Sequence, residues 1–396
     1  MKDRQKGGCG ETPPPQPVSS SPGPACGCAD PVVRETPSCC GTAGPDKYEG
    51  LHQDSYVEGW VDTPAGPIPR VNAIIRARDV LGRWKMRWGI GRGGYRIAPG
   101  LYALGRPGAD SVVLVTANFK MTFDALRREL AGIDAWILVL ETYGINVWCA
   151  AGKGTFGTEE IVRRVKAVRL EEVVDHRRLI LPQLGAPGVS AHEVRRGCGF
   201  HVVYGPVYAR DIKRFLEDGM KATPLMRRVE FPVSERIVLM PVELVGSLKP
   251  AAWAALALFL AAGIGPGIFS PAAALERGWP AVVMMAGGIF GGAVLTPLLL
   301  PWLPWKAFSA KGALVGGMLA ASVFFSYEGS SGAIHALPVL FALPAISSFV
   351  AMNFTGATPF TSPSGVEKEM RWAIPVQAVL AVLASVTWIS GAFPGY

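Results

Sequence analysis

Short apolar runs alternate with amphipathic segments through the middle of this chain of 396 residues. Residues 112–117 and 135–140 are almost entirely apolar, as expected of strands that are buried on both faces. The segment TFDALRREL between them has the apolar spacing of a helix. The alternation continues to residue 219, where we predict two further strands and three further helices in RLILPQ, HVVYGP, EEIVRRVKAVRL, SAHEVRRG and VYARDIKRFLEDG.

Strands that alternate with helices in this way predict an α/β fold with a Rossmann-like, mostly parallel sheet. Ligands of such sheets bind beyond the carboxyl ends of the strands. The residues that directly follow each predicted strand are therefore the first place to look for a functional site.

Beyond Lys249 the pattern changes to five long apolar stretches at 251–270, 279–300, 310–327, 333–354 and 372–393. Each is close to the roughly 20 residues that a helix needs to cross a bilayer, so we expect a transmembrane bundle of five helices in contact with membrane lipid. Small residues in GGIFGGA and GALVGG favour close contact between these helices. Lys306 and Lys311 lie in one connection, and the positive-inside bias places that connection in the cytoplasm.

Composition supports a division into three parts. Hydrophobic residues make up 49% of the chain and charged residues only 18%, which is too apolar for an ordinary soluble protein. We expect a disordered tail rich in Cys, Pro and Gly over residues 1–47, a cytoplasmic ligand-binding domain over 48–245 and a transmembrane domain over 246–396. The tail has no apolar core of the kind a signal peptide needs, so we expect an inner-membrane, multi-pass protein with its N-terminal domain in the cytoplasm.

The net charge of +8 raises the question of nucleic acid. No nucleic-acid-binding motif supports that partner, and we expect none. The arginines of residues 83–96 are better suited to a membrane surface or to an acidic partner protein.

Five of the seven cysteines lie in the tail, without the spacing of a zinc site or an iron-sulfur cluster: Cys9, Cys26, Cys28, Cys39 and Cys40. Two interpretations stay open. The cysteines are either incidental in a disordered segment, or they capture a soft, thiophilic metal ion.

The segment NVWCAAGK, residues 146–153, places one cysteine directly after the second predicted strand. If the segment is helical, its spacing puts Asn146, Cys149, Ala150 and Lys153 on one face. The small residues after the cysteine would let a wide, flat ligand approach the sulfur. The lysine one turn later favours the thiolate, which is the form that binds metals. We therefore prefer Cys149 as a functional residue over a structural, buried cysteine.

NVWCAAGK also resembles the cap-helix signature of the membrane-bound corrinoid proteins of microbial mercury methylation. The cofactor domain of that family is similar to the large subunit of the corrinoid iron-sulfur protein of acetyl-CoA synthesis. The resemblance covers most of residues 112–371, through VLVTANFKMTFDALRREL, LPQLGAPGVSAHEV, GFHVVYGPVYARDI and MNFTGATPFTSPSGVEKEMR.

This resemblance implies a cobalamin-type corrinoid whose cobalt has the Cys149 thiolate as its lower axial ligand. It implies a corrinoid-dependent methyltransferase that passes a methyl group from methylcobalt(III) to inorganic Hg(II), forming methylmercury. A methyl-folate or a donor methyltransferase would supply the methyl group. A ferredoxin-like iron-sulfur protein would supply electrons, because the chain has no cluster motif of its own.

The resemblance places the expected corrinoid contacts in the cap helix and in the polar or glycine-containing strand ends. They are Asn146, Val147, Trp148, Cys149, Ala150, Ala151, Gly152, Lys153, Thr116, Asn118, Gln183, Gly185, Ala186, Gly188, Tyr204 and Gly205. Glycine lets backbone approach a ligand closely, and Thr, Asn and Gln can bond the amide arms of a corrin. Without the resemblance, ordinary turn chemistry would account for the strand-end residues.

Two other functions stay open. A corrinoid methyl carrier for another acceptor, as in acetyl-CoA metabolism, would share the cofactor domain but would not explain an axial cysteine. A membrane metal-thiol transporter would use the tail cysteines and the helical bundle. It would be expected to carry ionisable groups or thiols within its spans, where His335 is nearly alone.

Overall fold

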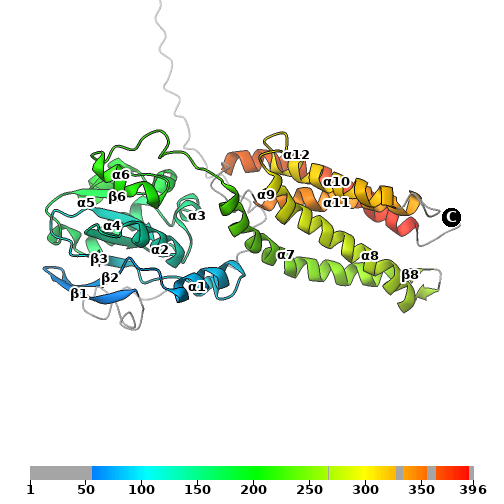
Figure 1. Ribbon diagram of the computed structural model, residues 1–396, viewed down its shortest axis with the longest axis horizontal. Helices are drawn as coiled ribbons and strands as arrows, with labels where there is room; N and C mark the ends of the chain where they lie inside the picture. The colour runs from blue at the N-terminus through cyan, green and yellow to red at the C-terminus, as the bar shows by residue number, and fades with distance from the viewer. Residues whose placement is uncertain (1–55, 266, 327–332, 355–362, 392–396) are drawn as a thin grey trace, which may run out of the picture. The chain divides into compact units, whose positions relative to one another are not determined.

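The computed structural model describes residues 56–265, 267–326, 333–354 and 363–391 of the chain (Figure 1). The predicted tail of residues 1–47, with its five cysteines, lies outside the described residues.

Residues 57–204 contain a seven-stranded sheet with helices on both faces (Figure 1). The strands are β1 (Val57–Thr63), β2 (Gly66–Val71), β3 (Gly100–Leu104), β4 (Val113–Ala117), β5 (Ala135–Leu140), β6 (Arg178–Leu181) and β7 (His201–Tyr204), in the order β1-β2-β3-β5-β4-β6-β7. Strands β5, β4, β6 and β7 run parallel, as do β2 and β3. The pairs β1–β2 and β3–β5 are antiparallel. The prediction of a mostly parallel sheet is confirmed.

Each face of the sheet has its own apolar core. Helices α3 (Val147–Gly152), α4 (Thr158–Ala167) and α5 (Ala191–Cys198) cover one face, and α2 (Lys120–Glu129) and α6 (Ile212–Glu217) cover the other. Val113, Val115 and Ala117 of β4 belong to the first core and Leu114 to the second, as the alternation of side chains along a strand requires. Every residue of β4 is buried, which explains its uninterrupted apolar sequence.

Four elements before residue 105 were not predicted from the sequence: β1, β2, β3 and α1 (Ala77–Arg87). Strand β2 reads GPIPRV, and proline cannot donate a hydrogen bond to a ladder, so its sequence argues against a strand. It is tolerated because β2 pairs through Pro67 and Pro69 only with β1, at the edge of the sheet. Short 3-10 turns complete the region at η3 (Arg92–Gly94), η4 (Leu170–Glu172), η5 (Gln183–Gly188) and η6 (Ala209–Asp211).

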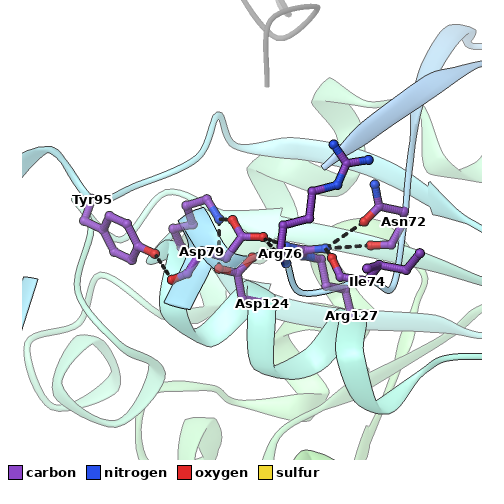
Figure 2. Close-up of polar contacts among 8 residues, drawn as sticks. Asn72, Ile74, Arg76, Asp79, Tyr95, Asp124 and Arg127 are labelled. Atoms are coloured by element: carbon purple, nitrogen blue, oxygen red, sulfur yellow. Dashed lines mark hydrogen bonds and ion pairs between the residues drawn. The ribbon is translucent and has the colours of Figure 1, made fainter. Parts of the chain in front are cut away.

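A buried network of charged side chains ties α1 to α2 (Figure 2). We call it the Arg127 cluster; it consists of Asn72, Asp79, Lys120, Asp124 and Arg127. The guanidinium of Arg127 is fully buried. It donates hydrogen bonds to the carboxylates of Asp79 and Asp124 and to carbonyl oxygens of residues 72 and 74, with donor–acceptor distances of 2.7 to 3.1 Å. The ammonium of Lys120 bridges Asp79 and Asp124 at 2.7 and 2.8 Å.

The charges in the Arg127 cluster are balanced within it. Burial alone would raise the pKa of Asp79, but hydrogen bonds from Lys120 and the Arg76 backbone, with the charges of Lys120 and Arg127, hold that pKa below its ordinary value. Lys120 also lies 5.3 Å from the ring centre of Tyr56. Each buried charge of the cluster is therefore paired with an opposite charge, as buried charges require.

The remaining described residues form long apolar helices. They are α7 (Val233–Ala262), α8 (Pro271–Phe290), the π-helix η7 (Gly291–Leu295), α9 (Thr296–Leu299), α10 (Phe308–Ser326), α11 (Ala333–Asn353) and α12 (Pro363–Ser390), with a small hairpin of β8 (Ile264–Gly265) and β9 (Ile268–Phe269). Within the described part of the chain, four helical stretches are long and apolar enough to cross a membrane: Val233–Ala262, Pro271–Leu299, Phe308–Ser326 and Gly365–Ser390.

The fourth predicted span, 333–354, falls on α11 (Ala333–Asn353), in which Leu337–Asn353 is apolar but is not among the four stretches named above. Five spans therefore stay a prediction. So does the division of the chain at residue 246, which falls inside α7.

Glycines let the apolar helices approach closely, as the small-residue segments predicted. A Cβ added at Gly312 of α10 would meet the Ser347 carbonyl of α11, and one at Gly316 would meet the Leu343 carbonyl. The expected lysine connection is corrected in one respect. Lys311 lies within α10, where it is buried and donates to the Leu300 carbonyl at 2.9 Å, so only Lys306 remains in the connection.

Candidate functional site

The predicted site residues gather where the parallel strands end. Strand β4 lies between β5 and β6. The chain passes from β4 to β5 on one side of it and then to β6 on the other side, so the strand order reverses at β4. Ligands of open α/β sheets bind in the crevice at such a reversal of strand order. Helix α3 follows β5 and η5 follows β6, and these two segments pack against each other.

Helix α3 forms where the sequence predicted a short helix. The side chain of Asn146 caps its start by accepting a hydrogen bond from the Cys149 backbone N–H at 2.9 Å. Lys153 ends it, donating its own N–H to the Cys149 carbonyl at 3.1 Å. The Cys149 side chain is half-buried.

The predicted shared face of α3 is wrong for one residue. Ala150 is fully buried in the core with Val147 and Ala151, whereas Asn146 and Lys153 are exposed. Val147, Ala150 and Ala151 are spaced so that they share the side of the helix that faces the core. Ala150 therefore points away from the side that carries the thiol. Trp148 is half-buried like the thiol.

Room beside the thiol comes from another residue. Gly152 lies one turn after Cys149, and a Cβ added there would meet nothing within 4 Å. The accessible side of α3 therefore consists of the ends of the NVWCAAGK segment and the glycine, with the half-buried sulfur between them.

Asn118, which directly follows β4, holds the loop that leads into α3. Its Oδ1 accepts the backbone N–H groups of Thr142 and Gly144 at 3.2 and 2.9 Å, and its Nδ2 donates to Glu141 at 2.7 Å. The side chain is fully buried. Asn118 therefore positions the cap-helix loop, which is a different role from the corrin contact that the sequence predicted.

Thr116 is also buried, on the other face of the sheet. Its neighbours Val115 and Ala117 belong to the core beneath α3, so the side chain of Thr116 points toward the opposite core. The structure does not bring Thr116 together with Cys149.

The glycines of η5 are required by α3 itself. A Cβ added at Gly188 would lie 3.0 Å from the Ala151 Cα and would overlap the Phe156 carbonyl. A Cβ added at Gly185 would overlap the Phe156 ring. Both glycines allow the loop after β6 to press against the cap helix and the turn behind it, so close backbone packing explains them directly.

The other predicted contacts lie around this junction. The Gln183 side chain accepts a hydrogen bond from Arg227, and Ala186 is half-buried in η5. The Tyr204 hydroxyl donates to the Val189 carbonyl at 2.8 Å, which ties β7 to the end of η5, and burial raises the pKa of that hydroxyl. Gly205 donates its N–H to the Leu181 carbonyl at 2.8 Å.

Sequence reasoning missed two residues that support the cap helix. The Glu160 carboxylate of α4 accepts the Glu141 N–H at 2.8 Å and pairs with Arg164 at 2.8 Å. The fully buried ring of Phe156 fills the space between α3 and η5. The role of Glu160 could have been predicted from its position in the first turn of an amphipathic helix, close to the strand-end loops. The packing role of Phe156 could not be predicted, because the sequence shows only an apolar residue in a glycine-rich turn.

We predict that Gly188→Ala loosens this junction. The added methyl must displace the Phe156 carbonyl or the Ala151 backbone, which should cost about 1–3 kcal/mol in free energy of unfolding. Hydrogen–deuterium exchange of the full-length protein should then quicken in peptides that cover α3 and η5. Gly152→Ala, on the same helix but facing open space, is the control and should leave exchange unchanged or slower. Equal behaviour of the two variants would contradict the packing role of Gly188.

Comparison with known proteins finds similarity in the middle of the chain. Residues 92–216 match the family model of the CO dehydrogenase/acetyl-CoA synthase delta subunit. The gamma subunit of the acetyl-CoA decarbonylase/synthase complex of Archaeoglobus fulgidus is 35% identical over 124 residues, which are 31% of this chain and 26% of that subunit. The corresponding subunit of Methanopyrus kandleri is 33% identical over 123 residues, again 31% of this chain and 26% of that subunit.

The large subunit of the corrinoid/iron-sulfur protein of Moorella thermoacetica is 31% identical over 122 residues, 30% of this chain and 27% of that subunit. The chain thus spans about a quarter of the length of the curated relatives it matches. The matched segment begins at η3 and ends in α6, and it contains β3 to β7 with the whole candidate site. This part of the chain is therefore related to corrinoid-protein subunits.

Proposed function

We propose that this chain is a membrane-attached corrinoid protein that carries a methyl group between a donor and an acceptor. One observation carries the proposal: the half-buried Cys149 thiol lies on a capped helix at the carboxyl edge of the parallel sheet, within the segment related to corrinoid-protein subunits. The four described helical stretches that are long and apolar enough to cross a membrane would hold this site at a bilayer.

The residues at this edge fit a corrinoid in two respects. A thiolate is an electron-rich ligand that binds transition metals well, and Gly152 leaves space beside Cys149. When bound, a corrinoid supplies a cobalt centre that can accept and release a methyl group. In this proposal Cys149 would hold the cobalt, and the exposed Asn146, Gly152 and Lys153 would lie beside the bound corrinoid.

The residues behind α3 keep this thiol in place. Asn118 and Glu160 fix the loop that enters the helix, and Gly185 and Gly188 let η5 support it from the other side. These are positioning residues, since each acts through the backbone of α3 or its loop. Contacts of this kind orient a metal ligand, and they normally raise the metal affinity or the activity of the site.

The methyl acceptor distinguishes two forms of the proposal. The names of the relatives, subunits of acetyl-CoA decarbonylase/synthase complexes, favour a carrier for acetyl-CoA-type metabolism. The NVWCAAGK segment favours Hg(II), because its resemblance to the mercury-methylating family includes the cysteine itself. In either form a methyl-folate or donor methyltransferase and a ferredoxin-like electron donor are the proposed partners, and the α/β region lies in the cytoplasm.

Methyl transfer by the full-length protein tests the proposal. The protein is purified in a membrane mimetic and loaded with cobalamin. It is then given an isotopically labelled methyl donor and a strong reductant. Hg(II) and a purified acetyl-CoA decarbonylase/synthase complex are then offered separately. Labelled methylmercury supports the mercury form, and label in acetyl-CoA supports the carrier form. A protein that retains no corrinoid and transfers no label to either acceptor would contradict both forms.

A further inference from the structure

Helix α1 exposes an apolar stripe that is flanked by cations on both sides. Successive residues of an α-helix turn by about 100°, so Val80, Leu81, Trp84 and Trp88 lie along one side of it. Their exposed fractions are 40, 55, 47 and 47%. Arg78 and Lys85 border this stripe on one side, and Arg83 and Arg87 border it on the other.

The opposite side of α1 is fixed to the α/β region. Met86 is buried there, and Asp79 belongs to the Arg127 cluster. Gly82 lets the Tyr95 ring lie against the helix, because a Cβ at this position would come within 2.8 Å of the Tyr95 hydroxyl. Asp79 is the sole acidic residue of α1, and it points inward. The outward side therefore presents apolar and positive groups together.

We propose that the outward side of α1 binds the surface of an anionic lipid bilayer. Leucine and tryptophan side chains with basic residues on each flank are the pattern of helices that lie in the plane of the membrane interface. Tryptophan prefers that interface because its ring is apolar and its N–H is polar. The basic flanks match the negative potential of anionic headgroups.

A bilayer is within reach of this helix in the intact protein. Residues 218–232 connect α6 to α7, and a fully extended connection of that length spans at most about 50 Å. Because α7 is long and apolar enough to cross a membrane, the α/β region would be held close to lipid headgroups at high effective concentration. Docking of α1 would then fix which side of this region faces the membrane.

Photo-crosslinking of the full-length protein in nanodiscs tests the proposal. The nanodiscs contain phosphatidylcholine with about one-third phosphatidylglycerol, to supply an anionic surface. p-Benzoylphenylalanine replaces Trp84 or Trp88, or Glu193 on α5 as an exposed control, and adducts are identified by mass spectrometry. We expect lipid adducts at positions 84 and 88 to exceed those at 193 by about five-fold or more.

Charge reversal gives a second, independent result. With the probe at position 84, Arg78→Glu combined with Lys85→Glu should lower lipid adducts by about ten-fold in anionic nanodiscs. The matched control, Lys166→Glu combined with Lys213→Glu on α4 and α6, should leave them unchanged. Adducts from position 84 to a second copy or to another protein, equal lipid adducts at 84 and 193, or insensitivity to the reversal at 78 and 85 would each overturn the proposal.

Discussion

Alanine in place of Cys149 should lower methyl transfer by the cobalamin-loaded, full-length protein by about 100-fold or more. Loss of residues that merely orient a metal ligand costs about 10–100-fold, and loss of the ligand itself should cost at least as much. The fold should survive, since Cys149 is half-buried and the core side of α3 consists of Val147, Ala150 and Ala151. The measurement is the rate of labelled methyl transfer at equal corrinoid occupancy.

Two further variants define what the thiol contributes. Cys149→His supplies a ligand without the electron donation of a thiolate, so it should retain corrinoid but transfer methyl poorly. Cys198→Ala is the control, because the Cys198 thiol donates to the Val194 carbonyl at 3.2 Å within α5 and burial raises its pKa. Wild-type transfer by Cys149→Ala would contradict the role of this residue in either form of the proposal.

Methionine in place of Arg127 should destabilise the α/β region by about 3–5 kcal/mol. The substitution keeps much of the side-chain volume but removes five hydrogen bonds and leaves the buried carboxylates of Asp79 and Asp124 with only Lys120 between them. Removing one partner from a buried ion pair has this cost because the remaining charge stays desolvated. Urea titration of the full-length protein, followed by pulse proteolysis of the α/β region, measures the change.

The adjacent residue gives a matched control. Arg128 pairs with Glu129 at the surface, where its side chain is 55% exposed, and such pairs contribute about 0–1 kcal/mol. Arg128→Met should therefore have little effect on unfolding. Because the Arg127 cluster joins α1 to α2, Arg127→Met should also lower lipid adducts at position 84. A cost for Arg127→Met as small as that for Arg128→Met would contradict a structural role of the cluster.

The sequence predicted those strands and helices whose burial leaves a local pattern. Strands β4 and β5 are buried on both faces and read as uninterrupted apolar runs, and α2, α4 and α5 each show an apolar stripe. Strands β1 and β2 show no such pattern, whereas β3 is a buried apolar run, GLYAL, that sequence reasoning missed. Strand β3 is placed by its antiparallel pairing with β5, more than thirty residues later. Strand β2 tolerates its prolines because Pro67 and Pro69 pair with β1 and not with β3.

The candidate site was predictable in position but only partly in detail. A cysteine among small residues, directly after a buried strand, correctly indicated a short helix at the carboxyl edge of the sheet. The inward turn of Ala150, the loop-holding role of Asn118 and the packing role of Gly188 depend on contacts with residues distant in sequence. Residue type and spacing within one segment do not predict such long-range contacts.

The absorption spectrum of the full-length protein reconstituted with cobalamin tests the central claim most directly. Wild type and Cys198→Ala should both show the absorption of a thiolate bound to cobalt, and Cys149→Ala should lose it while keeping bound corrinoid. A cobalt spectrum that is identical in wild type and Cys149→Ala, at equal corrinoid content, would contradict Cys149 as the axial ligand.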